Sequence, residues 1–133
     1  MKRPEAREQA FLLLFDKSFH PEMTLDEVIA LACADDMVKL NTFARGLVQT
    51  VCDEQMRIDE AIEQNLQGWK MQRISRVSLA LLRLAVGELL LGDTPQGVVV
   101  NEAVELCKTY AGEADASFVN GVLRSYLRGQ AAE

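Results

Sequence analysis

The chain has 133 residues, with 20 acidic and 14 basic side chains and a formal net charge of −6, and 49% of its residues are apolar. This composition excludes a disordered chain, and the length suits a single domain over residues 1–133 with no room for a second, catalytic one. The excess of acid also argues against a nucleic-acid partner, because phosphate binding depends on Lys and Arg.

Apolar residues recur at helical spacing along the whole chain, which predicts an all-α fold. Pro4 suits the first turn of a helix, where its missing N–H would be unpaired in any case. Thr24 and Glu27 have the spacing of a capping box, and Gly92 and Pro95 break the chain after a long apolar segment. The predicted helices span about 4–19, 24–34, 36–56, 58–67, 74–91, 97–110 and 115–128.

The predicted helix 74–91 is apolar around most of its circumference, which is typical of the buried centre of a domain. We expect the other helices to pack around it. Arg83 and Glu88 lie within this segment and argue against a membrane span. The first residues lack the pattern of a signal peptide, and the three widely spaced cysteines fit reduced thiols, so a soluble cytoplasmic protein is expected.

The reactive side chains form no recognised catalytic or metal-binding motif. His20 is the only histidine, which excludes a His-based triad or a His-rich metal site. The sequence has no CxxC, GxGxxG or P-loop motif. The carboxylate pairs Asp35–Asp36 and Asp59–Glu60 stand at predicted helix starts, where they fit capping better than catalysis. We therefore expect neither an enzyme nor a bound metal or cofactor.

Charge is distributed unevenly along the sequence. Residues 22–63 carry three basic and ten acidic side chains, a net of −7, and residues 88–133 carry a net of −4. Residues 1–21 have a net of +1, and residues 64–87 hold four basic side chains and no acidic one. If the first helix packs beside the start of the fifth, their basic residues form one positive face on an acidic body. The alternative is that these are ordinary solvated side chains.

Trp69 and Phe118 each allow a structural and a functional interpretation, whereas Gly121 is interpreted as structural. Trp69, the only tryptophan, is expected to be a core anchor rather than a stacking platform. Phe118 either packs in the core or presents an exposed stacking ring. Gly121 lies inside the last predicted helix, where Gly costs about 1 kcal/mol relative to Ala. That cost indicates close packing of another helix at Gly121.

Four segments resemble motifs of the NusB transcription antitermination family. They are Ala6–Arg7–Glu8 with Ala10 and Leu13–Leu14–Phe15, Leu82–Arg83–Leu84–Ala85 with Glu88–Leu89, Val100 to Lys108, and Phe118 to Leu123. The last two stand at the spacing of the family's final two helices, and the similarity runs nearly end to end. The resemblance implies about seven helices in two subbundles around the helix at 74–91, and no catalysis.

The resemblance also implies partners. Members of the family pair with NusE, a small-subunit ribosomal protein that also serves transcription. Together they bind the boxA element of nascent RNA and help RNA polymerase read through terminators, notably in ribosomal RNA operons. Recognition would then be of single-stranded RNA, in which unstacked bases meet side chains and phosphates meet Arg and Lys. Some members are dimers, so a homodimer is a further expectation that the sequence leaves open.

Site residues follow from the same resemblance, position by position. Those expected to bind RNA are Lys2, Arg3, Arg7, Arg76, Arg83 and Phe118. Those expected to face the partner protein are Phe15, Ser78 and Leu79.

The match to the family is incomplete at these sites. Pro4 and Glu5 interrupt an arginine run that is typical of the family, and Ser117 replaces a lysine. Phe15 stands where tyrosine is common, and Ser78–Leu79 replaces an acidic–basic pair. We therefore expect weak RNA binding by the isolated chain and a stronger dependence on NusE.

Two alternatives share this fold. One is the RNA-binding module that is fused to ribosomal RNA cytosine methyltransferases, against which the lack of any methyltransferase domain in 133 residues counts heavily. The other is a protein-interaction module whose RNA binding is weakened or lost, as the interrupted arginine run would allow.

Overall fold

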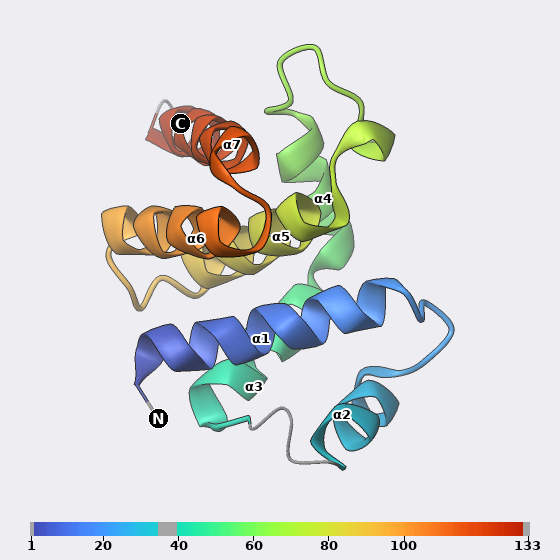
Figure 1. Cartoon of the computed structure of the whole chain (residues 1–133). Coiled ribbons are helices and arrows are strands. Elements are labelled where there is room, and N and C mark those ends of the chain that lie inside the picture. The colour runs from blue at the N-terminus through green and yellow to red at the C-terminus, as the bar shows by residue number, and fades with distance from the viewer. Residues whose placement is uncertain (1, 35–39, 132–133) are drawn as a thin grey trace.

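The computed structural model describes residues 2–34 and 40–131, and over these residues it contains seven α-helices, one short 3-10 helix and no strand (Figure 1). The α-helices are α1 (Arg3–Ser18), α2 (Leu25–Cys33), α3 (Thr42–Asp53), α4 (Gln55–Glu63), α5 (Arg76–Leu91), α6 (Gln96–Tyr110) and α7 (Glu113–Ala131). The 3-10 helix η1 spans Met71–Arg73, in the segment between α4 and α5. The predicted all-α fold of about seven helices is confirmed.

Local capping signals fix several helix ends where the sequence predicts them. The Thr24 hydroxyl accepts a hydrogen bond from the Glu27 backbone N–H at 3.2 Å, and the Glu27 carboxylate accepts from the Thr24 N–H at 2.8 Å. These bonds complete the capping box of α2 and hold the pKa of Glu27 below its usual value. Gly92 ends α5 in the left-handed region, with φ of 74°.

The predicted helices 36–56 and 58–67 are wrong at their boundaries. α3 begins at Thr42, because the Asn41 side chain caps it by accepting from the Ala44 N–H at 2.8 Å. Positions 36–39 of the prediction, with the Asp35–Asp36 pair, lie outside the described residues. α4 begins at Gln55 and ends at Glu63, so residues 64–67 belong to the following loop.

Asp59 consequently sits in the middle of α4 and does not cap a helix start. Its carboxylate accepts two hydrogen bonds from Arg83 of α5, at 2.8 and 2.9 Å. The start of α5 is also later than predicted, at Arg76. The Ser75 hydroxyl caps this helix by accepting from the Ser78 N–H at 3.1 Å.

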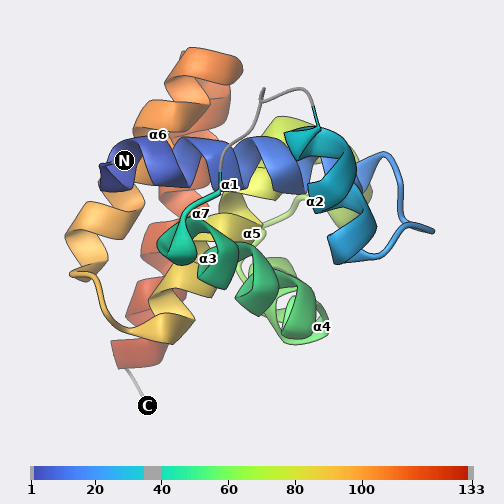
Figure 2. The ribbon, with the colours of Figure 1, turned by 90° about the horizontal axis from the view of Figure 1, so that it is seen from below.

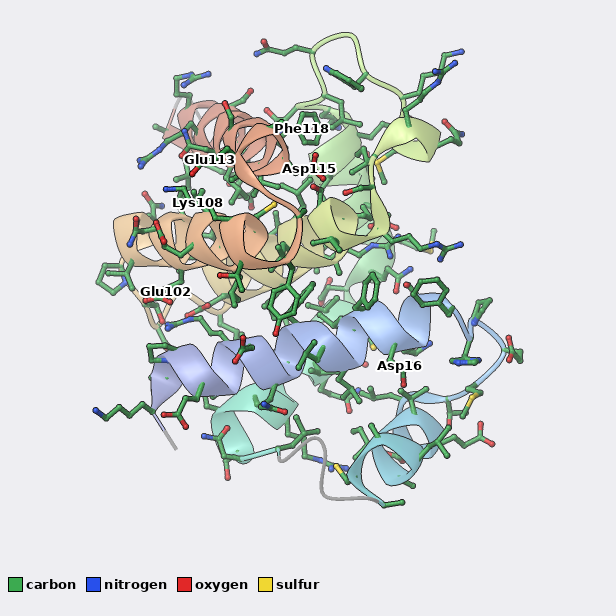
Figure 3. The ribbon with its side chains drawn as sticks, viewed as in Figure 1. Asp16, Glu102, Lys108, Glu113, Asp115 and Phe118 are labelled. Carbon is green, nitrogen blue, oxygen red and sulfur yellow. The ribbon has the colours of Figure 1, made fainter. Side chains whose placement is uncertain are left out.

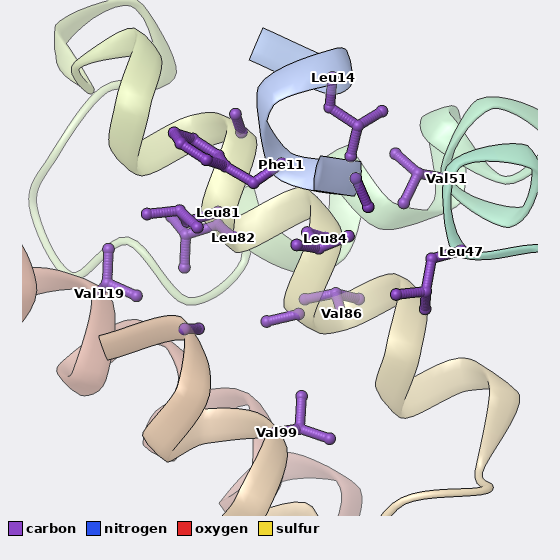
Figure 4. Close-up of a cluster of buried hydrophobic side chains, with 14 of the residues drawn as sticks. Phe11, Leu14, Leu47, Val51, Leu81, Leu82, Leu84, Val86, Val99 and Val119 are labelled. Atoms are coloured by element: carbon purple, nitrogen blue, oxygen red, sulfur yellow. The ribbon is translucent and has the colours of Figure 1, made fainter. Parts of the chain in front are cut away.

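α5 lies at the centre of the bundle, as predicted. It packs against α1 and α3 on one side and against α4, α6 and α7 on the other (Figures 1 and 2). Its side chains belong to one hydrophobic cluster with those of α1, α3, α4, α6 and α7, part of which is drawn in Figure 4. The cluster includes Phe11, Leu14, Leu47, Val51, Leu81, Leu82, Leu84, Val86, Val99 and Val119.

α1 runs antiparallel to α5. Arg7 near the start of α1 bonds Glu88 near the end of α5, and Arg76 at the start of α5 bonds the carbonyl of Ser18 at the end of α1. An α-helix of 16 residues is about 24 Å long, so the two ends of this helix pair are well separated. This antiparallel arrangement decides which charged residues meet.

Gly87 of α5 faces Val51 of α3 with no room for a side chain. A Cβ built there would lie 2.7 Å from Cγ2 of Val51, a buried side chain with few alternative rotamers. We expect Gly87→Ala to lower the free energy of unfolding by about 1–3 kcal/mol in urea denaturation. Adding Val51→Ala should recover part of the overpacking cost; equal destabilisation by G87A in both backgrounds would contradict the contact.

Gly121 is the matched control, and there the sequence prediction of close packing is wrong. A Cβ at Gly121 meets nothing within 4 Å, although the residue is in the interior of α7. Gly121→Ala should therefore raise stability by up to about 1 kcal/mol, because Ala favours the helix.

Candidate functional site

The predicted RNA-binding cations divide between the two ends of the α1–α5 pair. Lys2 and Arg3 are exposed at the start of α1. The Arg3 guanidinium lies 3.8 Å from the centre of the Phe43 ring, which orients it at the surface without neutralising its charge. Both residues are accessible to a phosphate group.

Arg7, also at the start of α1, is in a different environment. It is only 5% exposed, and its Nε and Nη2 donate to the two carboxylate oxygens of Glu88 at 2.8 and 2.7 Å. The hydrogen bonds that Arg7 donates to Glu88 raise the pKa of Arg7 against the opposing effect of burial, so its guanidinium stays charged. This geometry disfavours the predicted phosphate contact and makes Arg7 a structural cation that joins α1 to α5.

Arg76 lies at the other end, beside aromatic residues of α1. Its Nη1 donates to the Ser18 carbonyl at 3.0 Å, and its guanidinium lies 4.5 Å from the Phe19 ring centre. Phe19 in turn meets Phe15 edge to face at 5.1 Å between ring centres. The structure thus brings Arg76, predicted to bind RNA, close to Phe15, predicted to face the partner.

A cavity of about 500 Å³ opens between the end of α1, the end of α3 and the start of α5. Its wall holds three cations, Lys17, Arg76 and Arg83. The full lining is Leu14, Lys17, Ser18, Pro21, Val51, Cys52, Gln55, Arg76, Leu79, Ala80 and Arg83. Burial raises the pKa of the Cys52 thiol, while Lys17 and Arg83 oppose that shift.

The single positive face predicted for the first and fifth helices therefore forms only in part, from Lys17, Arg76 and Arg83. Because the helices are antiparallel, it is Lys17 that shares the cavity with Arg76, while Lys2 and Arg3 lie at the far end. Arg83 is 19% exposed and tied to Asp59, which neutralises much of its charge. Arg76 is thus the exposed cation at the start of α5.

Of the residues predicted to face a partner protein, Ser78 is the one that the structure buries. It is 1% exposed, and its hydroxyl donates to Asp115 at 3.1 Å. A direct contact with a partner is disfavoured at that depth. Leu79 is half-buried in the wall of the cavity, and Phe15 is half-buried between Phe11 and Phe19.

Trp69 is the functional candidate that sequence reasoning misjudged. The predicted core anchor is wrong, because the side chain is 57% exposed. Its ring meets the half-buried Phe118 edge to face, with 5.6 Å between centres and 63° between planes. Phe118 thus fits neither of its two predicted environments fully. The sequence feature that could have indicated an exposed Trp69 is its position beside Lys70, in a segment without acidic residues.

The described residues offer neither a metal site nor a membrane span. Over 2–34 and 40–131, no group of three or more His, Cys, Asp or Glu side chains is placed to hold a metal ion. Within the same ranges, no helix has the length and hydropathy to cross a membrane. Cys33, Cys52 and Cys107 are free thiols.

The bundle has the fold of solved antitermination factors. A crystal structure of antitermination factors NusB and NusE in complex with dsRNA matches with a TM-score of 0.84 and 31% identity, covering 96% of each chain. The solution structure of NusB from Aquifex aeolicus matches with a TM-score of 0.81 and 31% identity, covering 98% of this chain and 92% of the other.

Sequence comparisons agree with this structural similarity to NusB. The model of the NusB family matches residues 4–128. A transcription antitermination protein NusB from Listeria monocytogenes is 42% identical over 92% of this chain and 94% of its own length. One from Lysinibacillus sphaericus is 38% identical over 95% of this chain and 97% of its own length. The chain belongs to the NusB family.

Proposed function

We propose that this protein is a transcription antitermination factor that pairs with NusE and binds boxA RNA, promoting read-through by RNA polymerase, notably in ribosomal RNA operons. The observation that carries the proposal is the match over nearly the whole chain to antitermination proteins, at 42% identity. A solved relative, a complex of NusB and NusE with dsRNA, supports NusE as the protein partner and RNA as the ligand class. The role requires no catalytic group, and it places the protein in the cytoplasm where transcripts emerge.

The proposed RNA-binding groups are the exposed cations and an aromatic pair, Phe118 with Trp69. Lys2, Arg3 and Arg76 are exposed, so their charges are available to phosphates. Phe118 presents part of its ring beside Trp69. Arg7 and Arg83 contribute to RNA binding only indirectly. Arg7 is hydrogen-bonded to Glu88 of α5, and Arg83 to Asp59 of α4.

Phe15 and Leu79 form the proposed surface for NusE. Phe15 continues a run of aromatic contacts from Phe11 to Phe19, which holds its ring at the surface of α1. Ser78 lies behind this surface and positions the Asp115 carboxylate.

A second candidate function is a NusB-fold interaction module that keeps NusE and has weak or no RNA binding. The observation that favours it is that Arg7 and Arg83 are hydrogen-bonded to Glu88 and Asp59. Two of the cations predicted to bind RNA are therefore not available to phosphates. The two functions differ in a direct experiment. Capture of NusE by the immobilised chain, together with a gel shift of boxA RNA by the complex, supports antitermination. Capture without a shift supports the interaction module, and failure of both contradicts the proposal.

A further inference from the structure

The exposed Trp69 ring is held in a defined position by its surroundings. The backbone N–H of Trp69 donates to the Leu66 carbonyl at 2.7 Å, and Gly68 before it adopts φ of 87°. On the other side, Phe118 supports the indole edge to face. Phe118 projects from the start of α7 toward the segment that leads into α5 (Figure 3). A large aromatic surface is thus fixed in place and open to solvent.

Two hollows flank this aromatic pair, and both rings line each of them. One hollow, of about 280 Å³, also has Asn65, Gln67 and Arg128 in its wall. The other, of about 210 Å³, also has Arg73 and Asp115 in its wall. Each hollow therefore combines a π surface, a cation and hydrogen-bonding groups. That combination suits a planar base attached to a phosphate backbone.

The charge around the pair favours an anionic ligand. Between positions 64 and 87 the sequence has no acidic residue, and Lys70 and Arg73 next to Trp69 are exposed. Asp115 is the one carboxylate in the walls of the two hollows, and its Oδ2 already accepts hydrogen bonds from Ser75 at 2.8 Å and Ser78 at 3.1 Å. The remaining surface is acidic on balance, since the whole chain has a net charge of −6.

We propose that Trp69, supported by Phe118, is a stacking site for an unpaired base of single-stranded RNA, with Arg73 and Arg128 contacting the adjoining phosphates. The site deepens the proposed function and rests on it, because the ligand is the same RNA. It adds the segment between α4 and α5 to the RNA-binding surface. Base stacking on an aromatic side chain contributes about 5- to 150-fold in affinity and tolerates any base.

The protein supplies its own reporter, because Trp69 is the only tryptophan. Titration of the full chain with single-stranded boxA RNA should quench its intrinsic fluorescence, and a fully paired duplex of the same sequence should quench it less. Trp69→Ala should weaken the affinity for labelled single-stranded RNA about 5- to 150-fold without changing its salt dependence, since stacking releases no counterion. Arg73→Ala should instead reduce the slope of log affinity against log salt by about 0.7.

Two further variants separate stacking from folding. Trp69→Phe keeps an aromatic ring and should recover most of the affinity lost in Trp69→Ala. Leu31→Ala is the matched control, because it removes an exposed apolar side chain, 59% exposed, from α2. It should leave RNA affinity unchanged. Thermal unfolding of each variant verifies that the fold is retained.

The outcomes distinguish this site from the proposed function. RNA binding with no change in tryptophan fluorescence and full affinity in Trp69→Ala would overturn the stacking site and leave antitermination standing. Reduced capture of NusE by Trp69→Ala, with RNA affinity intact, would assign the ring to a protein partner and also overturn it. If no RNA binds with or without NusE, the stacking site and the RNA part of the proposed function both fail.

Discussion

Arg7→Met is expected to lower the free energy of unfolding by about 3–5 kcal/mol, because it leaves the Glu88 carboxylate buried without its partner. Glu88 is 3% exposed, and Arg7 supplies both of its hydrogen bonds at 2.7 and 2.8 Å. Replacing both residues, as in Arg7→Met with Glu88→Leu, should restore most of the loss, since an apolar pair avoids the desolvation of two charges. Urea denaturation of the three variants measures these differences.

The same variants test how Arg7 relates to RNA. If Arg7 is structural, the double variant should bind RNA with the salt dependence of the parent chain. Lys2→Ala with Arg3→Ala is the comparison, and it should lower the slope of log affinity against log salt by about 1.4. A stable Arg7→Met protein with a flattened salt slope would contradict the buried ion pair and return Arg7 to the RNA-binding surface.

Phe11→Ala is expected to cost about 3–5 kcal/mol of unfolding free energy, because it opens a large cavity in the core where α1 packs against α5. Phe11 is 1% exposed, and its ring centre lies 5.0 Å from that of Tyr110 and 6.0 Å from that of Phe15. Leu31→Ala, at an exposed position, should stay within about 0.5 kcal/mol of the parent chain. Guanidinium denaturation provides both values.

Phe11 also supports the proposed surface for NusE. The ring of Phe15 is supported by Phe11 on one side and by Phe19 on the other. Loss of Phe11 should therefore weaken NusE capture at temperatures where the variant remains folded. A loss of less than 1 kcal/mol, with NusE capture unchanged, would show that Phe11 supports neither the core nor the ring of Phe15.

The helices were predictable because their signals are local. Thr24 with Glu27 and Gly92 lie within one turn of the helix ends that they define. The central position of α5 followed from its nearly continuous apolar surface. The start of α3 was missed because apolar periodicity continued back through Leu40, while the Asn41 cap was the stronger signal.

The site was less predictable because it depends on contacts between distant residues. The ion pair of Arg7 and Glu88 joins positions 81 residues apart, and no local pattern encodes the antiparallel packing that makes it. An arginine in a basic segment therefore resembled a phosphate ligand. For Trp69 the error is the reverse, since a residue predicted to be buried is exposed. An aromatic residue between Gly and Lys is compatible with the core and with the surface, and only the tertiary structure distinguishes the two.

Affinity for boxA RNA, measured by fluorescence anisotropy with and without NusE at 50 and 200 mM salt, shows whether the chain binds this RNA together with NusE. We expect weak binding by the free chain with a shallow salt slope of about −2 to −3.5, because only Lys2, Arg3 and Arg76, with Arg73 and Arg128 at the stacking site, are exposed cations of the proposed RNA-binding surface. NusE should strengthen that binding at least about tenfold, within the ordinary range of coupling between two ligands. Tight binding by the free chain with a slope of about −5 or steeper, or no binding by the NusE complex, would contradict it.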